Sequence, residues 1–259
     1  MAFTVATWNV NSVRSRLHAL LPWLEKAGPD AVCLQETKVQ DHEFPASAIE
    51  GAGYQAAFRG EKSYNGVAIL SKTPIANVRS GFDDGGTPDE ARLIVGEVEG
   101  IPIVNTYVPQ GRAPDHPMFA YKLEWFARLR SYFESHFSPG QPFLWAGDLN
   151  VAPEPIDVHD PKRLIGHVCF NPRATEALES VKSWGLIDVF RRHVSDSGQY
   201  TYYDYRTQDG VTEGKGWRVD HILTTRPLAD RSVKSWIDLE PRRGERPSDH
   251  TPLLAEFDL

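Results

Sequence analysis

Eight short runs of apolar and β-branched residues recur along this chain of 259 residues, and they constrain its fold more than any other feature. Runs of this length and composition, bounded by polar residues, glycine and proline, predict buried β-strands. They lie at residues 3–10, 31–35, 66–71, 93–98, 101–108, 142–147, 218–224 and 252–257. The fourth and fifth runs are joined around Glu99-Gly100, which predicts a β-hairpin.

Helical patterns lie between some of these runs, at residues 16–27, 118–137 and 174–184. The first ends at Gly28-Pro29 and the third at Gly185, which are helix stop signals. Helices mixed with hairpins favour an α/β (α+β) arrangement with mixed sheets over a regular βαβ repeat. Because no repeat or long linker interrupts the pattern, we expect one domain over residues 1–259.

The cysteines, the N-terminal residues and the lack of a long apolar stretch indicate the cellular compartment in which we expect the protein. Cys33 and Cys169 are too few for a disulfide framework and match no C-x-x-C metal motif. Cys33 lies in an apolar run, where we expect a buried core thiol. The sequence shows no secretory signal and no apolar stretch near the roughly 20 residues that span a bilayer. We therefore expect a cytoplasmic protein that is neither secreted nor membrane-bound.

The net charge of −7 argues against a protein that coats nucleic acid through bulk charge. The acidic residues are unevenly distributed, however. Residues 41–50 and 81–100 carry net charges of −3 and −5, which leaves a net charge of +1 for the other 229 residues. A mildly basic face is therefore possible, with modest and salt-sensitive affinity for nucleic acid. Such a face would carry some of Lys38, Arg59, Lys62, Arg112, Arg206, Lys215 and Arg218.

Polar side chains occur where most of the runs are expected to end. They are Asn9 and Asn11, Glu36, Asn105 and Tyr107, Asp148 and Asn150, Asp220 and His221, and Asp249 with His250. Taken singly, such residues are more often turn residues or helix caps. Their recurrence at the ends of several buried runs is typical of an active site on a rigid scaffold.

The residue types narrow the chemistry. The sequence has no G-x-S-x-G elbow, no H-E-x-x-H motif and no G-x-x-x-x-G-K-[ST] loop. An oxygen-rich set with one motif histidine favours a hard cation, Mg²⁺ or Mn²⁺, over Zn²⁺. Such a cation with a histidine and amide donors suits phosphate-ester hydrolysis.

Six segments together resemble the exonuclease III family of apurinic/apyrimidinic (AP) endonucleases. They are Thr7-Trp8-Asn9-Val10-Asn11, Leu34-Gln35-Glu36-Thr37-Lys38, Tyr107-Val108-Pro109-Gln110-Gly111, Gly147-Asp148-Leu149-Asn150-Val151-Ala152-Pro153, Gly216-Trp217-Arg218-Val219-Asp220 and Ser248-Asp249-His250. They follow the family's order and span residues 4–257. The resemblance places the chain in the deoxyribonuclease I-like metal-dependent phosphodiesterases. It implies a four-layered sandwich of two packed mixed β-sheets flanked by helices.

The resemblance also implies roles for individual residues. Glu36 is the expected principal Mg²⁺ ligand, with Asn11 and Asp249 close by; Mn²⁺ is the expected substitute, and one or two ions remain open. The implied catalytic set is Asp148 for the attacking water, Asn150 beside it, His250 as donor to a phosphate oxygen, Asp220 to orient His250, and Tyr107 and Asn9 as phosphate contacts.

Recognition of an abasic site requires a pocket that a nucleotide carrying its base cannot enter without cost. The resemblance assigns this pocket to Tyr202, Trp217 and Val219, although Tyr202 and Trp217 could equally be ordinary sheet aromatics. Gln110 and Arg112 are implied DNA contacts, with a solvated loop arginine as the alternative for Arg112. Tyr at position 202, segment 155–170 and segment 113–117 depart from the family pattern and leave the endonuclease-to-exonuclease balance open.

The expected function is Mg²⁺-dependent incision of duplex DNA 5′ to abasic sites, which leaves a 3′-hydroxyl, with 3′–5′ exonuclease and 3′-end-trimming activity. The expected partner is double-stranded DNA with abasic sites or blocked 3′ ends, and the protein is expected to be a monomer. One alternative is a phosphoinositide or sphingomyelin phosphodiesterase on the same scaffold. The other is a catalytically inert DNA-binding relative.

Overall fold

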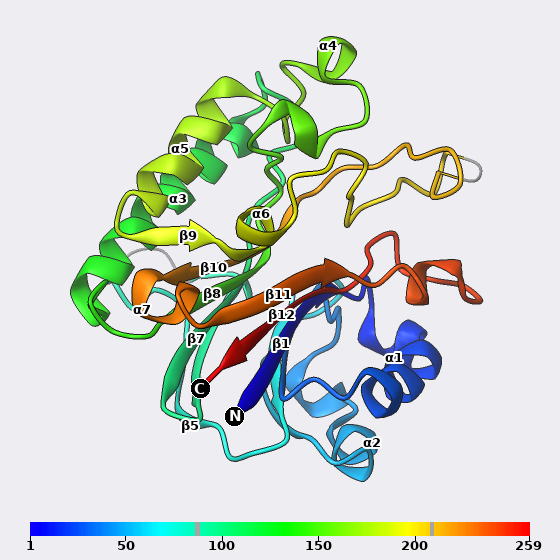
Figure 1. Ribbon diagram of the computed structural model, residues 1–259, viewed down its shortest axis with the longest axis vertical. Helices are drawn as coiled ribbons and strands as arrows, with labels where there is room; N and C mark the ends of the chain where they lie inside the picture. The colour runs from blue at the N-terminus through cyan, green and yellow to red at the C-terminus, as the bar shows by residue number, and fades with distance from the viewer. Residues whose placement is uncertain (86–88, 208–209) are drawn as a thin grey trace.

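The computed structural model describes residues 1–85, 89–207 and 210–259, and two six-stranded β-sheets packed face to face form its centre (Figure 1). Sheet A has the order β11-β12-β1-β2-β4-β3, from Ser232–Ile237, Leu253–Asp258, Ala2–Asn9, Ala31–Gln35, Val67–Ser71 and Gln55–Arg59. Sheet B has the order β5-β6-β7-β8-β10-β9, from Ala76–Ser80, Leu93–Val98, Ile101–Tyr107, Leu144–Asp148, Asp220–Thr225 and Leu186–Asp188. Both sheets are mixed: β1 and β2 run parallel, as do β7 and β8, while their other pairings are antiparallel.

Helices cover the outer face of each sheet, which completes four layers (Figure 1). Helices α1 (Val13–Ala27) and α2 (Ala46–Gly51) pack on sheet A; α3 (Pro117–His136) and α5 (Pro172–Lys182) pack on sheet B. Shorter turns complete the set: α4 (Pro161–Leu164), α6 (Val189–His193), α7 (Arg226–Ala229), and the 3₁₀ turns Asp41–Glu43, Pro155–Asp157 and Pro241–Arg243. The predicted sandwich is confirmed.

Alternation along the strands explains the layers. On β1, Phe3 and Val5 face the core between the sheets, while Ala6 and Trp8 face α1 and α2. The helix stop predicted at Gly28 is confirmed, since this residue caps α1 in the left-handed conformation with φ 56°. Cys33 is buried between the sheets, as expected.

All of the predicted strands and helices are present, with small shifts of their ends. Strands β3, β5, β9 and β11 were missed because they lack a continuous buried apolar run. Every residue of β5 is exposed, for example, and β9 has three residues. The predicted strand 218–224 begins later, at Asp220. In the described part of the chain, no helix is long and apolar enough to cross a membrane.

Two buried amides join the sheets. Nε2 of Gln35, the last residue of β2, donates to Oδ1 of Asn105 on β7 at 2.7 Å. Asn105 Nδ2 in turn donates to the carbonyl oxygens of Leu34 and Ala68 in sheet A, at 2.9 and 2.8 Å. Because both side chains are fully buried, this contact fixes the sheets against each other next to the strand ends where the polar residues gather.

Candidate active site

The inward-facing alternation that builds the core ends in polar residues at one edge of both sheets. Val5 on β1 is followed two and four positions later by Thr7 and Asn9, and Ala146 on β8 is followed by Asp148. The antiparallel register pairs Asp148 with Asp220 of β10. Side chains two apart share a strand face, so the same geometry that buries the core directs these groups into one cluster.

Asn9 links the two sheets within the cluster. Its Nδ2 donates to Oε1 of Glu36 at 2.7 Å and to Oδ2 of Asp148 at 2.9 Å. Its Oδ1 accepts from the backbone N–H of Asn11 at 3.0 Å, which fixes the direction of the amide. One buried amide thus holds two carboxylates in place while it offsets part of their charge.

Glu36 and its neighbours form a group of convergent oxygens. The Nζ of Lys38 lies 2.7 Å from Glu36 Oε2 and 2.5 Å from Asn11 Oδ1. Asn11 Nδ2 donates to Asp249 Oδ1 at 3.0 Å. Although burial works against the charged form of Glu36, Lys38 and Asn9 hold the pKa of this carboxyl below its ordinary value. Glu36 and Lys38 have positive φ angles of 51° and 53°, so the backbone here is strained to aim these side chains.

His250 and Asp220 form a buried charged pair. Nδ1 of His250 lies 2.8 Å from Asp220 Oδ2, and its Nε2 lies 3.7 Å from Asp148 Oδ2. Burial disfavours a charged ring, but the Asp220 and Asp148 carboxylates outweigh it and raise the pKa of His250 to about 10. At neutral pH the ring is therefore an imidazolium that donates from both nitrogens.

Asp148 sits at the centre of the cluster. Its Oδ1 accepts from the backbone N–H of Asn150 at 2.9 Å, and Asn150 Nδ2 donates to the carbonyl of Val108 at 2.9 Å. Burial raises the pKa of Asp148 to about 7, although the charged His250 ring acts in the opposite direction. Such a carboxyl exchanges protons near neutral pH, which is the property required of a general base.

The cluster opens into a cavity of about 390 Å³. Its lining includes the predicted Glu36, Tyr107, Gln110, Asp148, Asn150, Tyr202, Trp217, Val219, Asp249 and His250. Burial raises the pKa of Tyr107 well above its ordinary value, so its hydroxyl stays protonated. The remaining predicted residues lie close by: Asn9, Asn11 and Asp220 are hydrogen-bonded to residues of the lining, and Arg112 lines an adjoining cavity.

One wall of this cavity is aromatic. Tyr202 pairs through isolated β-bridges with both Trp217 and His250, and its ring centroid lies 5.0 Å from that of His250. The Trp217 ring packs at 4.7 Å on His167, which sequence reasoning did not single out. Cys169 and Asp204 also line the cavity and were likewise missed. None of these three lies at the end of an apolar run, so the strand-end signal could not find them.

Comparison with known proteins decides the family. Residues 6–250 match the model of the endonuclease/exonuclease/phosphatase family. Exodeoxyribonuclease III of Haemophilus influenzae is 34% identical over 263 residues, which cover 97% of this chain and 98% of the relative. The chain belongs to this family. It is accordingly a hydrolase of phosphodiester bonds.

Solved structures of similar proteins agree with the family. An AP endonuclease from Archaeoglobus fulgidus matches with a TM-score of 0.97 and 46% identity over 99% of this chain and 100% of that one. A 3′ phosphatase from Neisseria, solved with a product DNA hairpin, matches with a TM-score of 0.94 and 33% identity over the same shares. Enzymes of the family use metal, and Asp148, Asp220 and His250 place oxygen and nitrogen atoms within 4.8 Å of one another. While the His250 ring is protonated, only the two carboxylates of this group can ligate a cation.

A second cavity of about 300 Å³ adjoins the first in this family member. Glu36, Tyr107 and Gln110 line both cavities, and the exposed Arg112 lines the second, with Arg92 beside it. The Arg92 guanidinium lies 4.8 Å from the Tyr107 ring centroid. Arg112 therefore lies in a cavity that shares part of its lining with the cavity of Asp148 and His250.

Arg218, one of the candidates for a basic DNA-facing surface, does not belong to such a surface. Its side chain is 0% exposed, with Nε 2.7 Å from Asp157 Oδ1 and Nη1 2.8 Å from Asp188 Oδ2. Its charge is therefore neutralised inside the protein. The sequence alone does not show this, because both partners are far away along the chain.

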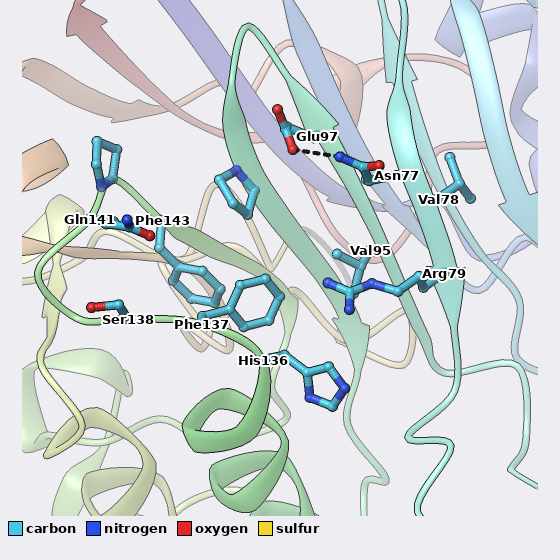
Figure 2. A pocket seen from close by; sticks show the side chains of 13 residues that line it. Asn77, Val78, Arg79, Val95, Glu97, His136, Phe137, Ser138, Gln141 and Phe143 are labelled. Atoms are coloured by element: carbon cyan, nitrogen blue, oxygen red, sulfur yellow. Dashed lines mark hydrogen bonds between the residues drawn. The ribbon is translucent and has the colours of Figure 1, made fainter.

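The larger cavity shown in Figure 2, of about 450 Å³, lies between β5, β6 and the C-terminal end of α3. Arg79, His136 and Phe137 contribute to its lining, and Asn77 Nδ2 donates to Glu97 Oε2 at 2.9 Å along its rim (Figure 2). Phe143, also in the lining, directly precedes β8, whereas Asp148 ends that strand. This cavity therefore lies at the opposite end of sheet B from the cluster.

Proposed function

We propose that the protein incises duplex DNA on the 5′ side of abasic sites in a Mg²⁺-dependent reaction that leaves a 3′-hydroxyl. Trimming of 3′ ends and 3′–5′ exonuclease activity accompany this incision. The observation that carries the proposal is the aromatic cavity directly beside the charged His250–Asp220 pair and Asp148. The activities in the names of the similar enzymes, exodeoxyribonuclease III, AP endonuclease and 3′ phosphatase, support it.

The donor set fits a hard cation. Glu36 Oε2 and Asn11 Oδ1 already converge on one positive charge, the Lys38 ammonium, and Asp249 is tied to Asn11. Carboxylate and amide oxygens are the ligands that Mg²⁺ prefers. We therefore assign Glu36, Asn11 and Asp249 to the metal, which supplies neutralisation of phosphate charge when bound.

Asp148 acts on the attacking water. Its pKa of about 7 lets it accept a proton at neutral pH, and the backbone N–H of Asn150 keeps the carboxylate oriented. Asn9 holds the same carboxylate from the other sheet. With both oxygens anchored, the carboxylate can align a water for in-line attack on the phosphorus.

His250 stabilises the charge that develops on the phosphate. The Asp220 carboxylate fixes Nδ1, which leaves the Nε2–H at the cavity to donate to a non-bridging oxygen. The protonated Tyr107 hydroxyl is a further donor to the phosphate. The Asn9 amide can contact the phosphate only when it releases Glu36 or Asp148, because both of its N–H groups are used by these carboxylates. Preorganised donors of this kind account for a large share of rate enhancement in enzymes.

Tyr202, Trp217 and Val219 select the lesion by shape. A sugar without a base can enter the aromatic wall region, whereas a normal nucleotide must first lose its stacking and pairing. Gln110 and the exposed Arg112 lie beside the cavity, where they can contact the DNA backbone. Because the proposed residues all come from one chain of residues 1–259, we propose that it acts as a monomer with one catalytic domain.

Product analysis tests this proposal. A labelled duplex with one stable abasic analogue should yield a single fragment that ends in a 3′-hydroxyl, and a recessed 3′ end on an intact duplex should be shortened more slowly. Both reactions should stop in chelator. Hydrolysis of an inositol phosphate or sphingomyelin without cleavage of either DNA would instead favour a phosphoinositide or sphingomyelin phosphodiesterase. DNA binding without any hydrolysis would favour the inert relative.

A further inference from the structure

Lys122 is a fully buried lysine on α3, a helix whose other inward residues are mainly aromatic and aliphatic. Its Nζ donates to three backbone carbonyls: Asn150 at 2.7 Å, Val168 at 3.1 Å and Gln110 at 3.2 Å. An ammonium has three N–H donors, so these contacts satisfy all of them. No ion pair of Lys122 is found within the described residues, and burial lowers the pKa of this amine.

Burying a charge without an opposite charge costs several kcal/mol in proteins, roughly. A leucine or methionine at this helix position would fill the space without that cost. We therefore attribute the presence of a lysine at this position to the three carbonyls that it binds rather than to core packing.

The three carbonyls belong to three separate segments that build the cavity. Gln110 follows β7 and lines both cavities, and Asn150 follows β8 and lines the first. Val168 lies between His167 and Cys169, which line the first cavity. Lys122 thus connects the three segments that build the cavity through hydrogen bonds to their backbone carbonyls.

The joint is tight. A Cβ built on Gly111, beside Gln110, would lie 3.0 Å from Val168 Cγ2 and 3.4 Å from Lys122 Cδ. Asn150 has a φ of 51°, a left-handed conformation that asparagine tolerates and that the contacts around its backbone hold in place. The hydrogen bond from Lys122 to the Asn150 carbonyl is one of the contacts that do so.

We infer that Lys122 is a positioning residue: it holds the segments of Gln110, Asn150 and Val168 at the spacing that the cavity needs. The inference about catalysis rests on the proposed function, but the inference about the three segments does not. A misplacement of about 1 Å at a reacting group can lower a rate by about 100-fold. Loss of Lys122 should therefore act at a distance on the reaction.

Hydrogen exchange tests the structural part without any substrate. In Lys122→Met, amides in residues 108–112, 149–153 and 166–170 should exchange at least about tenfold faster, while those of α3 and the strands keep their protection. Lys122→Gln, which retains two N–H donors, should give a smaller change. The matched control is Lys182→Met, on α5 at the surface and paired with Glu179. Faster exchange spread evenly over the molecule, or unchanged exchange in the three segments, would overturn the inference.

Kinetics tests the catalytic part. For Lys122→Met, kcat on the abasic duplex should fall by about 30- to 100-fold, while affinity for an undamaged duplex changes by less than about twofold. The pH–rate profile should keep its form and shift slightly to higher pH, because Lys122 touches no reacting atom but its positive charge acts on Asp148. A kcat within about threefold of wild type for the folded variant would refute the positioning role. If the wild-type protein were inactive on abasic DNA, the proposed function would be refuted instead. The hydrogen-exchange test of the structural role of Lys122 would still hold, because it uses no substrate.

Discussion

Nδ1 of His250 lies 2.8 Å from Oδ2 of Asp220, and this contact joins the two sheets of the sandwich. His250 lies just before β12 in sheet A, whereas Asp220 begins β10 in sheet B. The Asn9–Asp148 hydrogen bond crosses between the sheets in the same way. The reactive cluster is therefore assembled from two halves, and its charges are balanced only when both sheets are in register.

The raised pKa of His250 predicts a pH-dependent contribution to stability. The charged pair contributes fully below about pH 6.5, the ordinary pKa of histidine, and this contribution is lost as the pH rises through about 10. Urea unfolding in chelator should show wild type losing more free energy of unfolding between about pH 7 and pH 10 than His250→Asn does. The exposed His42→Asn should behave as wild type. Equal slopes for all three would contradict the prediction.

Asp148→Asn should separate activity from stability. We expect kcat on abasic DNA to fall by about 1,000-fold or more, because the variant cannot accept the proton of the attacking water. The melting temperature at pH 7 should change by only a few degrees, because relief from burying a carboxylate offsets the loss of one of its two accepted hydrogen bonds. Asp196→Asn, an exposed change, is the control. Activity within a few fold of wild type would eliminate Asp148 as the base.

Removal of the metal should abolish cleavage. EDTA should stop the reaction, and Mg²⁺ or Mn²⁺ should restore it. Glu36→Gln keeps the size of the side chain but loses its charge, so the Mg²⁺ concentration for half-maximal activity should rise by about tenfold or more. Direct titration of Mg²⁺ by calorimetry should show the same weakening. Activity that persists in chelator would disprove the assignment of Glu36.

Trp217→Ala should reduce the selection of lesions. We expect kcat/KM for the abasic duplex to fall by about tenfold or more, because the wall that contacts the base-free sugar is lost. The shortening of a recessed 3′ end on intact DNA should change less. An equal loss on the two substrates would show that Trp217 supports the cluster in general rather than the sugar pocket.

Arg218→Met should destabilise the fold. The change leaves Asp157 and Asp188 buried without this shared guanidinium partner, so the free energy of unfolding should fall by about 3–5 kcal/mol. Arg226→Met, which removes an exposed guanidinium near Asp230, should change it by less than about 1 kcal/mol. Urea denaturation at pH 7 measures both. A small effect at Arg218 would mean that Arg191, which also contacts Asp157, is sufficient.

The central strands could be predicted from sequence because burial on one or both faces leaves an apolar run. The outer strands could not: β5 is exposed along its whole length, and in β11 only Ser235 is buried among the described side chains. Their pairing depends on neighbouring strands, which supply hydrogen bonds regardless of side-chain character.

The residues of the site also divide into those that could be predicted from sequence and those that could not. Residues at strand ends, such as Asp148 and Glu36, could be predicted because polar groups recur at the ends of several apolar runs. Lys122 and Arg218 were not, because a single lysine or arginine in a polar stretch is normally solvated. Their burial depends on carbonyls or carboxylates that the fold brings from distant segments.

The amide pair Gln35–Asn105 has a consequence for how such an enzyme can adapt. Since the two halves of the cluster belong to different sheets, a small shear between the layers would change every distance across the cluster at once. A hydrogen bond buried just below it resists that shear. Changes to the packing around this one amide pair could therefore tune rigidity, and with it the working temperature of the enzyme, while every group that contacts DNA stays the same.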